Sequence, residues 1–389
     1  MSSFTWPDGM GALIKQHVID PEICIRCHSC EAACAIGAIE HDDVNVVVKA
    51  DVCNECMSCI PVCPTGSIDN WRLVATPYTL ADQYGWSELP AATALPAATV
   101  EASDATVAAL IADAHGGAAR APVSAAKPTV NLYPPSKPIE AVVQGNYRLT
   151  SETADSDIRH IVLNFEGRPF PVLEGQSLGV LAPGLDRLRL YSVASPRDGE
   201  RPGFHNVAIT VKRSGAGSNY LCDLKKGDRV RIAGPFGATF LAPDDPDARL
   251  LMICTGTGAA PFRGFTMRRQ RQLKGRGDMM LVFGARTPDA LPYFGPLAKV
   301  PDTVLAKLFA FSRVPGSPKQ YVQDKLLGAA PEVADRLADP RTHIYVCGLR
   351  GMEAGVEQAF VGIAESVGLS WEALRETMRA EGRYHVETY

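Results

Sequence analysis

Residues 24–34 read CIRCHSCEAAC, and residues 53–63 read CNECMSCIPVC. Both stretches have the spacing C-x2-C-x2-C-x3-C, and each cysteine of the first has its counterpart 29 residues later in the second. Gly37 and Gly66 follow the same shift. A fixed period of this kind indicates that one structural unit has been duplicated. The first cysteine run is Cys24, Cys27, Cys30 and Cys34, and the second is Cys53, Cys56, Cys59 and Cys63.

The spacing of the two runs resembles that of bacterial two-cluster ferredoxins, in which the fourth cysteine of each run ligates the other cluster. Soft thiolates select iron-sulfur clusters or zinc over hard cations. The resemblance therefore implies two 4Fe-4S clusters, which we call cluster A and cluster B. The expected ligands are Cys24, Cys27, Cys30 and Cys63 for cluster A, and Cys53, Cys56, Cys59 and Cys34 for cluster B.

Two other interpretations of the cysteines are weaker. Zinc sites usually have C-x2-C halves set further apart, and each run holds more cysteines than such a half needs. A disulfide framework implies a small secreted domain, but residues 1–20 lack the features of a secretory leader. We therefore expect a reducing compartment, the cytoplasm. Pro64 follows the second run as in the ferredoxins, whereas Ala35 follows the first, which predicts a looser turn after Cys34.

Length and composition predict a globular protein of several domains. The chain has 389 residues, more than one core usually organises, with 46% hydrophobic and 21% charged residues. No run approaches the length of a membrane span, so no membrane association is expected. The formal net charge is -4, and residues 1–75 carry ten Asp and Glu against four Lys and Arg. This acidic segment disfavours nucleic acid as a partner and could steer a protein partner by charge.

Three segments can be separated along the chain. Residues 15–74 form the expected two-cluster ferredoxin domain. Residues 75–137 are rich in Ala, Pro, Thr and Ser, which predicts a linker with one helix near residues 104–114. The remainder begins with short alternating strands and continues with buried strands that alternate with helices. This order predicts a β-barrel over residues 138–245, packed on a doubly wound α/β domain over residues 246–389.

Two motifs in this remainder could bind cofactors. The strand containing Arg189, Tyr191 and Ser192 offers an arginine fork for a pyrophosphate, a ring that can stack on a flat ring, and a hydroxyl at its edge. Taken alone, this tetrapeptide is equally well a half-exposed strand. The stretch TGTG at 255–258 follows an apolar strand and opens a helix, where backbone amides can approach a phosphate. An ordinary strand-to-helix turn is the alternative for this stretch.

From residue 139 onward the chain resembles plant-type ferredoxin-NADP reductases. The stretches that carry the resemblance include EGQSLGV, RLYSVAS, VKR, SNYLCDLKKGD, GPFG, CTGTGAAPFRGF, YVCGLRGMEAGV and the terminal VETY. The resemblance implies an antiparallel FAD-binding β-barrel and a Rossmann-like, parallel-sheet NADP-binding domain. It also implies that Arg189 contacts the FAD pyrophosphate, that Tyr191 stacks on the isoalloxazine and that Ser192 lies near flavin N5. The other implied site residues are Ser218, Thr257 and Gly258 for cofactor phosphates, Lys212 for cofactor binding, Cys347 and Glu387 for the hydride-transfer pocket, and Tyr389 for the second flavin face.

A basic loop predicts which nicotinamide cofactor binds. Ser312 and Arg313 are followed by Lys319 and Tyr321, with no acidic residue among residues 312–321. A 2'-phosphate needs cations and hydroxyl donors, whereas a bare ribose is normally held by an acidic residue. We therefore expect NADPH rather than NADH, the alternative being a solvated basic surface. The chain lacks the insertion before Ser218 whose aromatic residue stacks on the FAD adenine in plant-type members.

The order of the segments points to a partner. A two-cluster ferredoxin followed by a plant-type reductase resembles the reductase components of aerobic benzoyl-CoA oxygenases (benzoyl-CoA 2,3-epoxidases). The resemblance implies that electrons pass from NADPH through FAD and the clusters to a separate di-iron oxygenase. No histidine of this chain follows a Glu by three positions, so the Glu-x-x-His pairs of a di-iron bundle are absent. A general NADPH:ferredoxin oxidoreductase with a fused ferredoxin is the alternative, and intact motifs disfavour a non-catalytic electron-wiring subunit.

Overall fold

A computed structural model of the chain describes residues 3–4, 13–22, 24–54, 56, 58–60, 62–63, 65, 67–68, 70–74, 76–90, 120–185, 188–273, 278–349 and 351–388. The chain divides into two compact units. Unit 1 comprises Met1–Thr99 with Ser214–Asn219, and unit 2 comprises Val100–Arg213 with Tyr220–Tyr389. Within the described residues, no helix has the length and apolar character needed to span a membrane.

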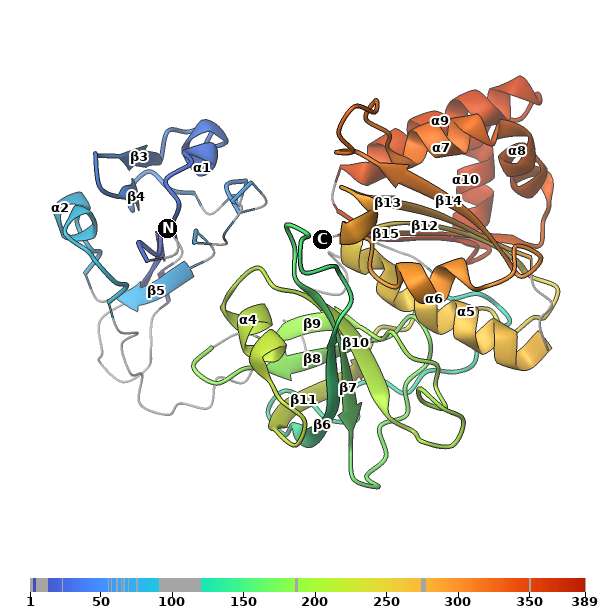
Figure 1. Ribbon diagram of the computed structural model, residues 1–389, viewed down its shortest axis with the longest axis horizontal. Coiled ribbons are helices and arrows are strands. Elements are labelled where there is room, and N and C mark those ends of the chain that lie inside the picture. The colour runs from blue at the N-terminus through green and yellow to red at the C-terminus, as the bar shows by residue number, and fades with distance from the viewer. Residues whose placement is uncertain are drawn as a thin grey trace. The chain divides into compact units, whose positions relative to one another are not determined.

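Unit 1 contains two small antiparallel sheets (Figure 1). Strands β1 (Ser3–Phe4), β2 (Leu13–Val18) and β5 (Asn70–Val74) form one sheet, and β3 (Ile39–His41) and β4 (Val46–Val48) form the other. Helix α1 (Ser29–Ala32) lies within the first cysteine run. The core is small and apolar, and the two runs contribute to it directly. Its buried members are Ile19, Cys30, Ile39, Val46, Val48, Cys59 and Ile68.

The residues at both ends of the segment 75–137 belong to the neighbouring units. Helix α2 (Leu80–Tyr84) is capped by Thr79, and its buried Gln83 donates from Nε2 to the Val48 carbonyl over 2.9 Å. At the other end, the backbone amide of Tyr133 donates to the Gly234 carbonyl of the barrel over 2.9 Å. The central part of the predicted linker, including the helix expected near residues 104–114, lies outside the described residues.

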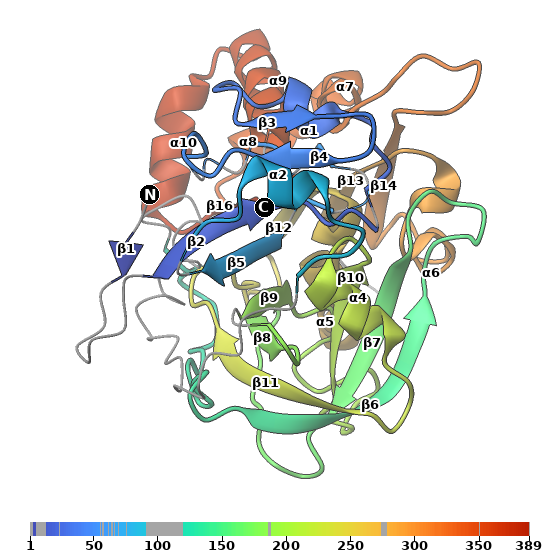
Figure 2. The same ribbon diagram turned by 90° about the vertical axis from the view of Figure 1, so that its left-hand side faces the viewer.

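The first half of unit 2 is an antiparallel sheet that closes into a barrel (Figures 1 and 2). Its strands are β6 (Ile139–Arg148), β7 (Ile158–Asn164), β8 (Ser177–Leu181), β9 (Arg189–Ser192), β10 (Val207–Lys212) and β11 (Arg229–Phe236). They pair in the order β10-β7-β6-β11-β8-β9, and Val193 pairs with Ile209 of β10, which joins the two edges. Closure leaves few unpaired edge groups. The expected antiparallel barrel is confirmed.

The second half of unit 2 is a parallel sheet with helices on both faces. Its strands are β12 (Arg249–Thr255), β13 (Met279–Ala285), β14 (Leu305–Phe311), β15 (Thr342–Gly348) and β16 (Tyr384–Thr388). The order β14-β13-β12-β15-β16 places the first strand at the centre, as in doubly wound folds. Ligands of such folds bind at the carboxyl ends of the strands next to this reversal of order. The Rossmann-like prediction is therefore confirmed.

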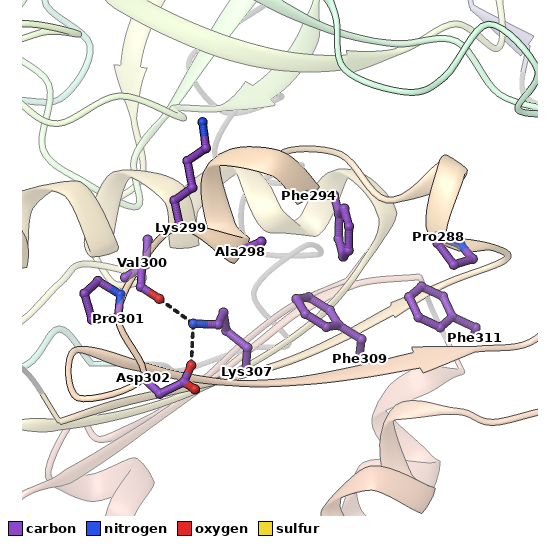
Figure 3. A pocket seen from close by; sticks show the side chains of 10 residues that line it. All are labelled: Pro288, Phe294, Ala298, Lys299, Val300, Pro301, Asp302, Lys307, Phe309 and Phe311. Carbon is purple, nitrogen blue, oxygen red and sulfur yellow. Dashed lines mark hydrogen bonds and ion pairs between the residues drawn. The ribbon is translucent and has the colours of Figure 1, made fainter.

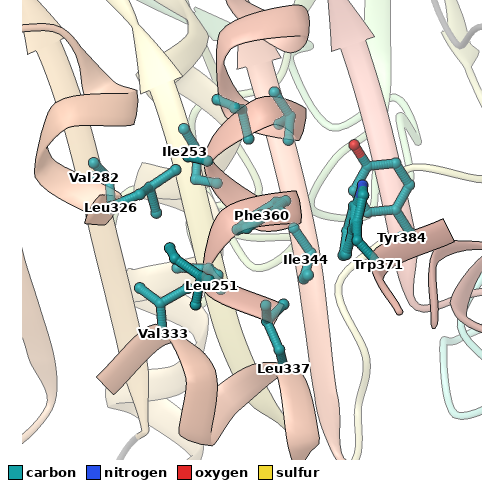
Figure 4. Close-up of a cluster of buried hydrophobic side chains, with 14 of the residues drawn as sticks. Leu251, Ile253, Val282, Leu326, Val333, Leu337, Ile344, Phe360, Trp371 and Tyr384 are labelled. Carbon is teal, nitrogen blue, oxygen red and sulfur yellow. The ribbon is translucent and has the colours of Figure 1, made fainter. Parts of the chain in front are cut away.

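Alternate residues of the central strand β12 enter two different cores. Leu251 and Ile253 face helices α7 (Val322–Gly328), α8 (Ala330–Ala338), α9 (Met352–Ser366) and α10 (Trp371–Ala380), as Figure 4 shows. In this core the Phe360 and Trp371 rings lie 4.6 Å apart. Met252 faces α5 (Ala259–Leu273) and α6 (Phe294–Ala298), where it packs with Phe262. Burial on both faces explains the continuous apolar run that predicted this strand.

Candidate cofactor sites

Three predicted site residues meet at the seam between the barrel and the parallel sheet of unit 2. Ser192, at the end of β9, donates from Oγ to Glu387 Oε1 over 3.2 Å. Glu387 on β16 pairs in parallel register with Cys347 on β15. Glu387 is 7% exposed and Cys347 is fully buried. The fold thus brings together three residues that are far apart in the sequence, and we call this group of Ser192, Cys347 and Glu387 the seam pocket.

The seam pocket favours uncharged groups. Burial raises the pKa of Glu387 to about 7, although the hydrogen bond from Ser192 opposes this shift. Burial, and then the neighbouring Glu387 charge, also raises the pKa of the Cys347 thiol. Among the described residues, nothing bonds to Glu387 Oε2. The pocket therefore offers one buried oxygen for a further polar group, next to a thiol that stays protonated at neutral pH.

Strand β9 has a surface that the protein covers only in part. All four of its side chains are half-exposed, whereas the following Val193 and Ala194 are fully buried. Burial raises the pKa of Tyr191 to about 12, and the nearby Arg189 charge opposes this shift. An aromatic ring with a guanidinium two residues away fits a flat ring system joined to a phosphate. The residues of this strand therefore fit a flavin nucleotide.

The TGTG turn is pressed against strand β15. Residues Gly256–Gly258 form the 3-10 turn η1, and α5 starts directly after it. A Cβ on Gly258 would lie 2.1 Å from the Cys347 carbonyl oxygen, so only glycine fits there. Thr255 Oγ1 accepts from the Leu349 amide over 3.3 Å. The half-buried Thr257 consequently lies in the turn just before the N-terminus of α5, at the carboxyl end of the central strand, where a pyrophosphate would be stabilised.

The predicted 2'-phosphate loop is exposed and basic. The Gln320 amide donates to the Phe311 carbonyl over 3.0 Å and closes the loop between β14 and α7. Arg313, Lys319 and Tyr321 are all exposed on it. Within the described part of the chain, neither Arg313 nor Lys319 takes part in an ion pair. Both cations are therefore available for an anionic ligand.

Arg286 is a residue of this site that the sequence did not indicate. Its carbonyl accepts from the Arg313 amide over 2.8 Å, and the Ser312 amide bonds to the adjacent Ala285 carbonyl over 3.1 Å. Burial, and then the Arg286 charge, lowers the pKa of Lys212 at the end of β10. Arg286 thus bonds to the 2'-phosphate loop through its backbone and lies near Lys212, a cation of the barrel. Only the pairing of β13 with β14, which the sequence does not specify, brings these residues together.

Two other predicted residues are less informative. Ser218 closes a turn before α4 (Ala216–Asp223), because its Oγ accepts from the Ser214 amide over 2.9 Å and from the Gly215 amide over 3.0 Å. This hydroxyl is therefore already engaged within its own turn. Tyr389 lies outside the described residues.

In unit 1 the structure brings together the four cysteines expected for cluster B and three of the four expected for cluster A. A cavity is lined by all four expected ligands of cluster B. Burial is the main reason why the pKa of Cys59 rises to about 12, and the nearby Cys53 contributes. Burial likewise raises the pKa of Cys30 to about 11, with contributions from Cys63 and Cys24, its expected partners in cluster A. Buried thiols that resist ionisation fit a metal cluster, whose iron would stabilise their thiolates.

The fourth cysteine of each run has different hydrogen-bond donors. Cys63 Sγ lies 3.3 Å from Ser67 Oγ and 3.7 Å from Thr65 Oγ1. In the first run, Cys34 Sγ accepts from the Ala38 amide over 3.2 Å. Ala38 corresponds to Ser67 in the duplication, so a side-chain hydroxyl stands at this position in only one of the two repeats. Hydrogen bonds to ligand sulfurs alter cluster potentials.

A buried polar network joins the barrel to the parallel-sheet half of unit 2. Tyr293 Oη bonds to His160 Nδ1 over 2.8 Å and to Thr210 Oγ1 over 2.6 Å. Glu200 accepts from Arg263 over 2.7 and 2.8 Å. Burial opposes the ionisation of Glu200, but His160 and Arg263 lower its pKa to about 2. The network joins two barrel strands to α5 and α6, and so fixes the two halves of unit 2 relative to each other.

An aromatic pocket contains none of the predicted site residues in its lining. Phe294 on α6 and Phe309 and Phe311 on the edge strand β14 line it (Figure 3). At its far end Lys307 bonds to Asp302 over 2.5 Å. This ion pair neutralises Lys307, whereas Lys299, which also lines the pocket, takes part in no ion pair within the described residues.

The chain matches three domain families. Residues 149–240 match the oxidoreductase FAD-binding domain, residues 252–358 the oxidoreductase NAD-binding domain, and residues 23–67 the 4Fe-4S dicluster domain. These matches follow the barrel, the parallel sheet and the cysteine runs. FAD, NADP and 4Fe-4S chemistry is therefore the cofactor set of this chain.

Full-length relatives agree with the domain matches. The cyanelle ferredoxin-NADP reductase of Cyanophora paradoxa is 38% identical over 288 residues, which cover 67% of this chain and 79% of that protein. The leaf isozyme 1 of Arabidopsis thaliana is 34% identical with the same coverages. The crystal structure of ferredoxin-NADP+ reductase from Plasmodium falciparum shares the fold, with a TM-score of 0.55 at 22% identity over 67% of this chain. The chain therefore belongs to the ferredoxin-NADP reductase family and is an NADPH-dependent oxidoreductase with a 4Fe-4S ferredoxin domain on the same polypeptide.

Proposed function

We propose that this protein passes electrons from NADPH through FAD and two 4Fe-4S clusters to a separate di-iron oxygenase that epoxidises benzoyl-CoA. The observation that carries the proposal is that hydride-accepting and single-electron machinery share one chain. A flavin accepts a hydride and releases electrons one at a time, which matches a two-electron donor to one-electron clusters.

The seam pocket orients the hydride donor. Ser192 and Glu387 hold each other by a hydrogen bond, and Glu387 keeps a proton on its carboxyl group up to about neutral pH. Cys347 contributes a buried, uncharged wall. A neutral pocket avoids trapping the cationic nicotinamide ring of the oxidised product by charge. On the flavin side, Arg189 would hold the pyrophosphate and Tyr191 would stack on the ring, and Lys212 and Ser218 would lie near phosphate groups. We propose that Tyr389 covers the opposite ring face.

The second half of unit 2 would select NADPH. Thr257 and Gly258 would place the start of α5 against the pyrophosphate. Ser312, Arg313, Lys319 and Tyr321 would surround the 2'-phosphate with two cations and two hydroxyls. The exposure of Arg313, Lys319 and Tyr321, and the lack of ion pairs to the two cations within the described residues, support this role.

The number of clusters can be measured directly. Eight cysteines in two crossed sets would hold about eight irons and eight acid-labile sulfides per chain, with one flavin. Anaerobically purified protein should show these values by metal, sulfide and flavin analysis. Half of the iron with the same flavin content would leave one cluster, and zinc in place of iron would remove the electron path.

The acceptor requires a functional assay. We expect purified benzoyl-CoA oxygenase to stimulate NADPH oxidation strongly, and only when benzoyl-CoA is present. A matched control replaces the oxygenase with a free ferredoxin that carries no oxygenase activity. Stimulation by the free ferredoxin alone would favour the alternative, a general NADPH:ferredoxin oxidoreductase. Stimulation by neither, in protein with full cofactor content, would refute both acceptors.

A further inference from the structure

Two imidazoles and one carboxylate converge beside the first cysteine run, in a place that no expected cluster ligand occupies. His28 Nδ1 lies 3.4 Å from Glu31 Oε2, and His41 Nδ1 lies 2.7 Å from the same oxygen. One ligand atom from each of the three residues lies within 4.8 Å of the others. The His28 and His41 rings are 4.0 Å apart. We propose that His28, Glu31 and His41 bind a divalent transition-metal ion, and that this ion raises the potential of cluster A.

The fold brings the three residues together from two elements. His28 and Glu31 lie three positions apart at the start of α1, so they share one helix face. His41 ends β3, which packs beside α1. His28 adopts a left-handed backbone conformation, with a φ of 55°, that non-glycine residues rarely adopt. Glycine would adopt this conformation more easily. The position between the expected cluster ligands Cys27 and Cys30 nevertheless carries an imidazole.

The distances fit zinc better than a hard cation. Zinc binds imidazole nitrogen and carboxylate oxygen at about 2.0 to 2.2 Å, so ligand atoms of a tetrahedral site are about 3.4 Å apart. The separation of 3.4 Å between His28 and Glu31 already matches this value. Within the described residues, His28 Nδ1 is shielded from solvent and makes no hydrogen bond. Its nitrogen therefore gains a partner when a metal binds.

His41 and Glu31 must move apart slightly to admit the ion. Their 2.7 Å separation is a hydrogen bond, and a metal would replace it. The side chains are 43% and 31% exposed, so this small movement meets little resistance. Three protein ligands leave a fourth tetrahedral position for water. The site is accordingly an open one, with two imidazoles and a carboxylate.

The position of the site couples it to the electron path. His28 stands one residue after Cys27 and two before Cys30, and both of these cysteines belong to the cluster A set. A divalent ion with one carboxylate adds positive charge there, which stabilises the more negative, reduced cluster. By linkage, reduction must strengthen metal binding by the same factor. This coupling rests on the proposed clusters, whereas metal binding by the three side chains does not.

Zinc binding to cluster-loaded protein tests the site. Zinc is redox-inert, so it exchanges no electrons with the flavin or the clusters. Titration calorimetry of anaerobically purified holoprotein should detect one zinc per chain without loss of iron. His41→Ala and Glu31→Gln should each weaken binding at least tenfold, because each removes one of the three ligands. Both variants leave all cysteines in place. The matched control is His205→Ala, which removes an exposed histidine of unit 2 and should leave binding unchanged.

Redox titration followed by electron paramagnetic resonance tests the coupling. Zinc should raise the potential of one cluster in the parent and in His205→Ala, and in neither site variant. Tenfold tighter binding to the reduced protein corresponds to a rise of about 59 mV for a one-electron couple. Unchanged zinc affinity in both site variants, or zinc uptake matched by iron loss, would overturn the site. Stoichiometric zinc with an unchanged potential would overturn the coupling, whereas iron content alone reports on the clusters.

Discussion

Replacing Glu387 by glutamine should make the stability of unit 2 less dependent on pH. Glu387 is almost fully buried, and burial raises its pKa from an ordinary 4.5 to about 7. Between these two values the folded protein keeps a proton that the unfolded chain has released. The free energy of unfolding of the parent therefore falls as the pH rises through this window.

The size of the effect follows from the pKa shift. A shift of one unit corresponds to about 1.4 kcal/mol, so the full penalty above neutral pH is about 3 kcal/mol. Near pH 5.5 about 1.4 kcal/mol of it is already present. Glutamine cannot ionise, so the variant should gain about 2 kcal/mol on the parent between about pH 5.5 and pH 8. The gain is relative, because glutamine can also alter the bond to Ser192 by a constant amount.

Urea unfolding of the two holoproteins at several pH values measures this gain. Fluorescence of Trp371, buried against α9, reports on the half of unit 2 that contains Glu387. The matched control is Glu376→Gln, which removes an exposed carboxylate of α10 and should track the parent at every pH. A difference between Glu387→Gln and the parent that stays constant from about pH 5.5 to pH 8 would show that the buried carboxyl is not held neutral.

Three further changes address the other parts of the molecule. Arg313→Gln should lower kcat/KM for NADPH about ten- to hundredfold and leave NADH almost unaffected, because one charged hydrogen bond to the 2'-phosphate is lost; equal losses with both nucleotides in steady-state assays would contradict the assignment of the loop. Tyr293→Phe should lower the free energy of unfolding by about 1 to 3 kcal/mol, because His160 and Thr210 lose a buried partner. The control Tyr133→Phe removes an exposed hydroxyl and should change the free energy of unfolding by less than about 1 kcal/mol in the same urea titration. Ser67→Ala should lower the potential of cluster A by about 40 mV, which is the equivalent of one hydrogen bond of about 1 kcal/mol, and Ala38→Ser should raise the potential of cluster B. Potentials that do not respond in a redox titration would exclude these contacts as determinants of the potential.

Local patterns in the sequence were sufficient to predict both folds of unit 2 and the 4Fe-4S domain. The spacing within each run and the shift between runs are local, and the structure brings Cys30 near Cys24 and Cys63 as the pattern implies. Apolar strands that alternate with helices likewise predicted the parallel sheet. Ser192 and Glu387 are different, because 195 residues separate them and only family resemblance placed them in one pocket.

Composition was a poorer guide where contacts are made by the backbone. The Ala- and Pro-rich segment predicted a linker, yet Gln83 is buried in unit 1 and Tyr133 pairs with the barrel. Arg286 escaped notice because a lone arginine after a strand carries no signal of its own. The site formed by His28 and His41 escaped for a related reason, since the two histidines are 13 residues apart and meet only when β3 packs beside α1.

The crossed arrangement of the cysteines has a consequence for how the protein matures. In the proposed assignment, each set draws three ligands from one repeat and the last from the other, so neither repeat can complete an inorganic centre by itself. During synthesis, the proposed ligands of cluster B would be complete once residue 59 has emerged from the ribosome, whereas cluster A must wait for residue 63. A chain that loses either repeat should lose both centres together.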